Sequence, residues 1–232
     1  GGNNTVENTP ESISMSELRT PISKEEFLAV GNEVLDVLMK VFQSTKKWDS
    51  IYGPESNEGI ELYERTEQDL LAVQSRGIVN GNIDDIFAIL TEKNLAKYQA
   101  KYDPDILQNT LIEDFGEVTV HYSRQYLGSM LTNREFVFVR VVKNLPGGGR
   151  IMGMKSVNST KRPIDANHVR GVINWGGVFV VPETTTSCLV HVGENIDLKG
   201  SIPSWASSLN KKKCADRISK LRESILDMPK KG

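Results

Sequence analysis

The sequence predicts an α+β fold in which a curved antiparallel β-sheet wraps around a long C-terminal helix and encloses an apolar cavity. Apolar residues recur at three- and four-residue spacing near both ends of the chain, which is typical of helices. In the middle of the chain the period changes to two, which is typical of half-buried strands. No helical pattern lies between Ile106 and Ile202, so we expect these strands to pair antiparallel through hairpins.

The N-terminal part is predicted to be an arm followed by a helix. Residues 1–23 mix Asn, Thr, Ser and Pro without periodicity, which indicates a flexible arm. Ser23 can cap the helix, and Glu26 follows it by three residues. The apolar face of this helix comprises Phe27, Leu28, Val34, Leu35, Leu38, Val41 and Phe42. We expect it to pack on a single domain spanning residues 24–228, with a short tail at residues 229–232.

Strands and a second helix follow in order. Two strands are predicted at residues 60–66 and 70–79, and a helix at residues 84–97 with Asn82 or Asp84 as its cap. Alternating or continuous apolar residues then predict further strands at residues 118–123, 136–142, 151–157, 169–181 and 185–195.

The last element is a predicted helix from Ile202 to Leu226. Its apolar stripe comprises Ile202, Trp205, Leu209, Cys214, Ile218, Leu221 and Ile225. From Lys199 to Gly232 there are nine Lys and Arg against three Asp and Glu, a local charge of +6 within a chain whose net charge is -2. A basic amphipathic helix of this kind suits contact with an anionic lipid surface, although core packing explains the stripe equally well.

Composition excludes several classes of protein. With 232 residues, of which 25% are charged, the chain can bury a core and is neither disordered nor fibrous. A net charge of -2 argues against nucleic acid as a partner. No apolar run approaches the roughly 20 residues that span a bilayer. The two cysteines suit a reducing compartment, so we expect a cytoplasmic protein.

Motifs for catalysis or metal binding are not recognisable. The three histidines are far apart and form no metal-binding pair with each other or with cysteine. The glycine-rich segment 146–150 precedes strand residues, which indicates a hairpin turn and not a phosphate loop. Cys188 and Cys214 lie in apolar patterns and are predicted core residues. We therefore expect no catalytic residues, no cofactor and no metal.

Polar residues within apolar strands are the candidate ligand contacts. Arg140 ends the run Phe136–Val139, and a buried guanidinium there would need a carboxylate, a ligand head group or water as its partner. An exposed position on the sheet is equally compatible with the pattern. His121 and His191 also lie within strands and are candidates, although a structural role explains such histidines more often. Weaker candidates for the cavity lining are Glu117, Tyr122, Lys155, Asn174 and Trp175.

Three segments together resemble the START family of lipid-transfer domains. The segment 132–140 (TNREFVFVR) is similar to the family's (S/P)-R-D-(F/Y)-V-x-x-R strand. Residues 169–182 resemble its V-R-G…P strand pair, and residues 195–205 resemble its D-x-(K/G)-G-x-(I/L)-P-x-W junction into the last helix. The resemblance covers roughly residues 25–228 and implies the helix-grip fold, which agrees with the order of elements given above.

The chain departs from the family pattern at informative positions. Tyr102-Asp103 stands where Trp-Asp is common, and Glu135 replaces the usual Asp. Arg140 matches an inward Arg that faces an acidic residue in sterol-binding relatives, and counting back without gaps places His121 at that acidic position. This resemblance therefore weakens a sterol assignment and leaves phospholipid, sphingolipid and fatty-acyl ligands open.

The resemblance implies a carrier that holds one lipid in an internal hydrophobic cavity and transfers it between membranes. The expected partners are the lipid and, transiently, a membrane surface, and we expect a monomer. Membrane or lid contacts are predicted in a loop and in the last helix, at Leu127, Met130, Leu131, Ile202, Trp205 and Leu209. The alternatives are a lipid-sensing interaction domain of a larger protein and, third, an enzyme built on a related fold.

Overall fold

The computed structural model describes residues 18–91 and 99–230. Within these ranges ten strands form one sheet, in the order β1-β2-β3-β10-β9-β7-β6-β5-β4, with β8 paired to β6. The strands are β1 (Asp49–Tyr52), β2 (Glu61–Glu67), β3 (Leu70–Val79), β4 (Ile106–Asp114), β5 (Val118–Gln125), β6 (Arg134–Asn144), β7 (Arg150–Ser156), β8 (Val169–Arg170), β9 (Val172–Pro182) and β10 (Cys188–Asp197).

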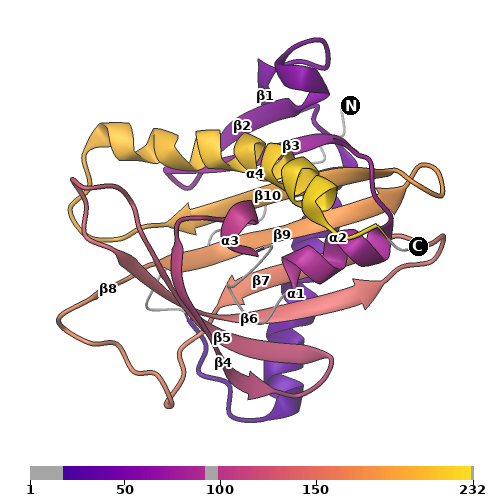
Figure 1. Cartoon of the computed structure of the whole chain (residues 1–232). Coiled ribbons are helices and arrows are strands. Elements are labelled where there is room, and N and C mark those ends of the chain that lie inside the picture. The colour runs from indigo at the N-terminus through magenta and orange to yellow at the C-terminus, as the bar shows by residue number, and fades with distance from the viewer. Residues whose placement is uncertain (1–17, 92–98, 231–232) are drawn as a thin grey trace, which may run out of the picture.

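Helices cover both faces of the sheet. Figure 1 shows α1 (Lys24–Gln43) behind it and α4 (Ser207–Asp227) in front, together with α2 (Ile83–Leu90) and α3 (Gln99–Tyr102). Two short 3-10 turns, η2 (Asn57–Gly59) and η3 (Ser204–Ala206), complete the elements. The predicted helix-grip arrangement of the α+β class is confirmed. None of the helices in the described ranges is long and apolar enough to cross a membrane.

The first helix forms for the reasons that its sequence suggests. The side chain of Ser23 accepts a hydrogen bond from the Glu26 amide at 3.2 Å, and the Glu26 carboxylate accepts one from the Ile22 amide at 2.7 Å. Phe27, Leu38 and the other apolar residues of the inner stripe are buried against the sheet. Helix α1 therefore covers one face of the sheet with a layer of apolar side chains.

The segment just before α1 is held by hydrogen bonds to the loop that follows β7. Residues 1–17 of the predicted arm lie outside the described ranges. The carbonyls of Leu18 and Arg19 accept hydrogen bonds from the side chain and the amide of Asn158. The last residues of the predicted arm therefore lie against the body of the domain.

The second helix and the strand pairing differ from expectation. Helix α2 is capped by Asn82, one of the two alternatives predicted, but it ends at Leu90 with Thr91 as its C-cap, and residues 92–97 of the predicted helix lie outside the described ranges. Strands β1 and β4 were not predicted. Strand β8 pairs with β6 in parallel, against the expectation of purely antiparallel pairing. The last strand, β10, lies between β3 and β9 and so joins the N-terminal hairpin to the rest of the sheet.

Close packing of α1 on the sheet depends on a glycine at position 177. A Cβ atom there would lie 2.2 Å from the Met152 carbonyl oxygen and 2.5 Å from Leu38 Cδ1. We expect Gly177→Ala to lower the free energy of unfolding by about 3 kcal/mol, because a backbone atom cannot move aside as a side-chain end can. Urea denaturation monitored by circular dichroism measures this change.

The neighbouring glycine provides the control. A Cβ at Gly176 would meet nothing closer than Ile173 Cγ2 at 3.5 Å, which is ordinary contact. Gly176→Ala should therefore change stability by less than about 1 kcal/mol. Equal losses for the two variants would contradict the close approach of α1 at Gly177.

Candidate functional site

A cavity lies between the sheet and the helices of its front face. Residues of β4, β5, β6, β7, β9 and β10 line it together with Leu90 of α2, Tyr102 of α3 and Arg217 of α4. Its volume is about 90 Å³. This is well below the roughly 300–1,000 Å³ of pockets for drug-sized ligands. A larger ligand can enter only if the lining moves apart.

The apolar part of the wall comes from alternating positions of the strands. Phe138 on β6 and Met152 on β7 face the cavity, whereas Val137 and Val139 on β6 point to the opposite face and pack under α1. Apolar lining residues in addition to these two are Leu90, Ile106, Met154, Ile173, Val178, Val192 and Ile196. The methionines are unbranched and adaptable, so this wall can reshape around a flexible chain.

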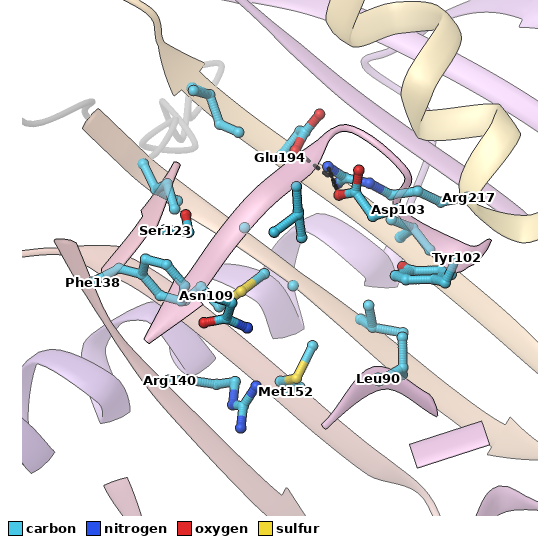
Figure 2. Close-up of a pocket in the computed structure, with 18 of the residues that line it drawn as sticks. Leu90, Tyr102, Asp103, Asn109, Ser123, Phe138, Arg140, Met152, Glu194 and Arg217 are labelled. Atoms are coloured by element: carbon cyan, nitrogen blue, oxygen red, sulfur yellow. Dashed lines mark hydrogen bonds and ion pairs between the residues drawn. The ribbon is translucent and has the colours of Figure 1, made fainter. Parts of the chain in front are cut away.

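Arg140 is a cation without a counter-charge in this cavity. It lies on the same face of β6 as Phe138, and Figure 2 shows its guanidinium beside Met152. In the described ranges, no hydrogen bond or ion pair to its side chain is present, and Thr119 is the residue opposite it on β5. Burial lowers the pKa of Arg140 below its ordinary value. A partly buried, unpaired cation of this kind favours a ligand that brings an anionic or strongly accepting group.

A second guanidinium, at Arg217, is by contrast well paired. Its Nη1 donates to Glu194 Oε2 at 2.8 Å, and its Nη2 lies 3.8 Å from Asp103 Oδ2. In Figure 2 this cluster lies on the other side of the pocket from Arg140. Burial alone would lower the pKa of Arg217, but the two carboxylates outweigh burial and raise it. Burial also raises the pKa of Asp103, against the opposing effect of Arg217. The cluster ties α4 to β10 and to Asp103, the residue that follows α3.

Several polar atoms in the lining have unused hydrogen-bonding capacity. Asn109 Oδ1, Ser123 Oγ and Glu194 Oε1 are buried and have no hydrogen-bond partner among the described residues. Figure 2 shows Asn109 and Ser123 on the same side of the view as Phe138. Because buried polar groups are normally satisfied, these atoms mark places where a bound ligand can form hydrogen bonds.

Of the seven residues predicted as ligand contacts, the structure places only Arg140 in the lining of this cavity. His121 lies on the cavity side of β5, but its ring stacks on Phe138 with centroids 5.5 Å apart, and its Nε2 lies 2.7 Å from Thr119 Oγ1. The gapless count placed His121 opposite Arg140. The observed register pairs His121 with Phe138 instead, because Thr119 stands opposite Arg140.

Two of the other predicted contacts point to the side of the sheet that α1 covers. Tyr122 packs beneath α1 and its hydroxyl donates to Glu135. The Lys155 ammonium donates to the Asn174 carbonyl at 2.8 Å, and burial lowers its pKa to about 8. Neither Tyr122 nor Lys155 lines the cavity in this structure.

The remaining three also lie in buried contacts outside the lining. Trp175 Nε1 donates to Glu67 Oε1 at 2.9 Å, and the side chain of Asn174 donates to that of Asn195 at 3.1 Å. His191 stacks between Phe42 and Phe179, and burial lowers its pKa to about 4. These three buried side chains, together with those of Tyr122 and Lys155, support the packing of α1 on the sheet.

Two segments at one edge of the cavity are held together by Arg134. This buried side chain donates to the carbonyls of Thr132 at 2.6 Å, Leu198 at 2.5 Å and Lys199 at 3.1 Å. It thereby ties the β5–β6 loop to the junction that leads into α4. Leu127 of the loop packs on Phe138, which also lines the cavity. This edge therefore borders the cavity directly.

The predicted membrane contacts at this edge divide into two groups. Met130 is 80% exposed, Trp205 46% and Ile202 38%. Leu127 is buried, and Leu131 and Leu209 are partly buried. The first group is available to a surface, whereas the second contributes to packing in this structure.

Most cations of α4 are engaged by the body of the domain. Lys211 pairs with Glu64 at 2.8 Å and Lys213 with Asp105 at 2.9 Å. Arg222 donates to the carbonyls of Ile78 and Glu58. The positive charge of the helix is therefore largely compensated within the domain and is less available to an anionic surface than its sequence suggested.

Sequence reasoning missed the Arg217 cluster and the polar lining residues of β4 and β5. The spacing of α4 nevertheless indicated a buried position for Arg217, because it lies three residues after Cys214 and four before Leu221, on the apolar stripe of the helix. Cys188 and Cys214 are buried free thiols, as predicted. No group of metal-ligating side chains occurs within residues 18–91 and 99–230.

One family model matches the sequence, and several solved structures share its fold. The START domain family matches residues 29–223 of the sequence. The human StAR-related lipid transfer protein 5 superimposes with a TM-score of 0.79 at 17% identity, covering 88% of this chain and 98% of that one. Human STARD10 gives 0.74 at 19% identity, covering 92% and 83%. A STAR-related lipid transfer protein from Xanthomonas axonopodis gives 0.65 at 20% identity, covering 78% and 99%. No curated protein matches the sequence significantly.

Proposed function

The chain belongs to the START domain family, and we propose that it binds a single lipid in the cavity between the sheet and α4 and carries it between membranes. The names of its structural neighbours, which are lipid transfer proteins, support lipid as the ligand class. The apolar wall with one unpaired guanidinium is the observation that carries the proposal. The proposed carrier is a cytoplasmic monomer that touches membranes transiently.

The cavity wall suggests how the lipid lies. Acyl carbons would replace the contacts among Met152, Met154 and Val178 as the wall widens, at a gain of about 0.8 kcal/mol for each buried CH₂ group. The head group would lie at Arg140, whose guanidinium can form two parallel hydrogen bonds with a phosphate or carboxylate. Because Thr119, a neutral residue, stands opposite Arg140, an anionic head is favoured over a sterol hydroxyl. Phospholipids and fatty acids fit this requirement.

The direct test is to extract the lipid that co-purifies with the protein, to identify it by mass spectrometry, and then to measure its transfer between donor and acceptor vesicles. We expect a one-to-one complex whose lipid carries an acidic head group and is recovered chemically unchanged. Bound lipid without transfer would instead support the sensing domain, and a covalently altered lipid would support an enzyme. A protein that binds no lipid would refute the proposal.

The exposed apolar edge is the proposed membrane contact. Met130, Ile202 and Trp205 can dip into the interface between head groups and acyl chains, where apolar side chains bind favourably. Since most cations of α4 are paired within the domain, we propose that these apolar side chains provide the main attraction and that anionic lipid adds to it.

The variant Met130→Asp tests this contact. Because Met130 is almost fully exposed, the substitution should leave stability within about 0.5 kcal/mol of wild type, while a charge at the membrane interface should slow vesicle transfer roughly tenfold. A fluorescence transfer assay measures the rate.

Leu226→Asp is the matched control, since Leu226 is equally exposed near the other end of α4. Its transfer rate should equal that of wild type. If Met130→Asp transfers lipid normally, or if both variants are slowed alike, the edge is not the contact.

A further inference from the structure

A second hollow lies on the opposite face of the sheet from the cavity. On β5, Ser123 points to the cavity, whereas Tyr122 and Arg124 point to this hollow. Its volume is about 540 Å³. The loop that connects β7 to β8 forms one wall with Arg162, and β8 adds Arg170. The hollow is therefore a separate site, divided from the lipid cavity by the sheet.

The two acidic residues of the hollow are already satisfied. Glu135 accepts a hydrogen bond from the Tyr122 hydroxyl and lies 3.6 Å from Arg170 Nη2. Asp165 accepts one from the Asn167 amide at 2.8 Å and lies 3.4 Å from His168 Nδ1. The carboxylates thus have internal donors and do not consume the remaining cationic groups.

Two of the three guanidinium groups, those of Arg124 and Arg170, retain an unused donor. The Nε atoms of Arg124 and Arg170 are buried and have no hydrogen-bond partner in the described part of the chain. The Nη atoms of Arg170 donate to the carbonyls of Arg162 and Pro163, which fixes its orientation. The guanidinium of Arg162 stacks 3.8 Å above the Tyr122 ring. The three arginines of the hollow face two carboxylates, so these five side chains carry an excess of one positive charge.

We propose that this hollow binds a phosphate monoester, of the kind carried by a phosphorylated inositol. A phosphate monoester presents three strong acceptor oxygens, which suits donors that converge from β5, β8 and the loop better than the two oxygens of a carboxylate do. Planar guanidinium groups match phosphate oxygens in pairs. The volume leaves room for a ring beside the phosphate, next to the exposed Pro163 and the 54% exposed Ile164. The site is additional to the proposed lipid cavity and does not depend on it.

The test is a calorimetric titration of the purified full chain with inorganic phosphate, with soluble inositol trisphosphate, and with phosphatidylcholine vesicles that contain phosphatidylinositol bisphosphate. We expect saturable binding of inositol trisphosphate, of the vesicles or of both, with inorganic phosphate binding more weakly. Binding of the vesicles alone would identify a lipid head group as the source of the phosphate. Binding of the soluble compound shows that a free phosphate ester suffices.

Substitutions distinguish this site from general electrostatic attraction. Arg124→Gln and, separately, Arg162→Gln should each weaken binding roughly tenfold or more, because each removes a charge-assisted donor. Lys161→Gln is the control, since Lys161 adjoins Arg162 in the chain but pairs with Glu113 and does not line the hollow. The proposal is overturned if none of the three probes binds, if both arginine variants bind like wild type, or if Lys161→Gln weakens binding as much as they do.

Discussion

Replacing Arg217 with methionine is expected to lower the free energy of unfolding by about 3–5 kcal/mol, because it leaves two carboxylates at the cavity wall without their counter-charge. Glu194 and Asp103 both have their side chains largely buried, and Arg217 is the cation that faces both of them. Methionine preserves most of the apolar stem, so the loss reports the charge and its hydrogen bond. Chemical denaturation of the lipid-free protein at neutral pH measures it.

The control is the same substitution at the other guanidinium of the cavity. Arg140 has no facing carboxylate in the described ranges, so Arg140→Met removes a partly buried, unpaired charge and should raise stability by roughly 1 kcal/mol. The same variant should bind acidic lipid more weakly. If Arg140→Met is destabilised as much as Arg217→Met, Arg140 has an internal counter-charge and its proposed role at the lipid head group fails.

The defect of Arg217→Met should depend on pH in a defined direction. Burial already raises the pKa of Asp103, and loss of Arg217 removes the main effect that opposes this rise. A carboxyl whose pKa is higher in the folded state than in the unfolded state disfavours folding above the unfolded value, and the penalty disappears as the pH falls and the group is protonated. The stability difference from wild type should therefore shrink between neutral and mildly acidic pH. An undiminished difference would exclude Asp103 as the source of the loss.

Filling the cavity should have the largest effect on lipid binding. Gly176 lies on the cavity wall between Met154 and Glu194 on the adjacent strands, and a Cβ there meets only ordinary contacts. The side chain introduced by Gly176→Leu would occupy much of the present 90 Å³. We expect the amount of co-purified lipid to fall at least tenfold, because the lining must then move further to admit a chain. Mass spectrometry against a protein standard gives this amount.

Stability separates this effect from misfolding. Filling an existing void usually leaves a domain as stable as before or slightly more stable, so Gly176→Leu should unfold at the wild-type urea concentration or above it. Gly176→Ala adds a single methyl group and should retain most of the lipid. Normal lipid content in folded Gly176→Leu protein would show that the lipid lies elsewhere.

The order of elements follows from local sequence patterns, and most of it could be predicted. The capped amphipathic stripe of α1 and the period-two runs of β5 and β6 depend on neighbouring residues alone. Strand β4 escaped prediction because its residues are mixed in polarity and both of its faces are partly exposed. The parallel contact of β8 with β6 escaped because it joins segments that are distant in the chain.

The candidate site was less predictable, because a period of two fixes which residues share a face but not which face is inward. Arg140 and Phe138 lie on one face of β6, whereas Tyr122 and Trp175 point to the other side of the sheet. Both faces are buried, one by α1 and one by α4 and α2, so a buried polar residue could belong to either.

The family and most of the element order can be deduced from the amino-acid sequence alone, since they depend on short motifs and on the spacing of apolar residues. The surroundings of each charge depend on how the strands and helices pack together. The register of β5 against β6 places Thr119 and not His121 opposite Arg140, and the packing of α4 pairs Arg217 and the lysines with acids from other elements. These pairings join residues far apart in the chain, so they exist only once the sheet is assembled and its two faces are covered.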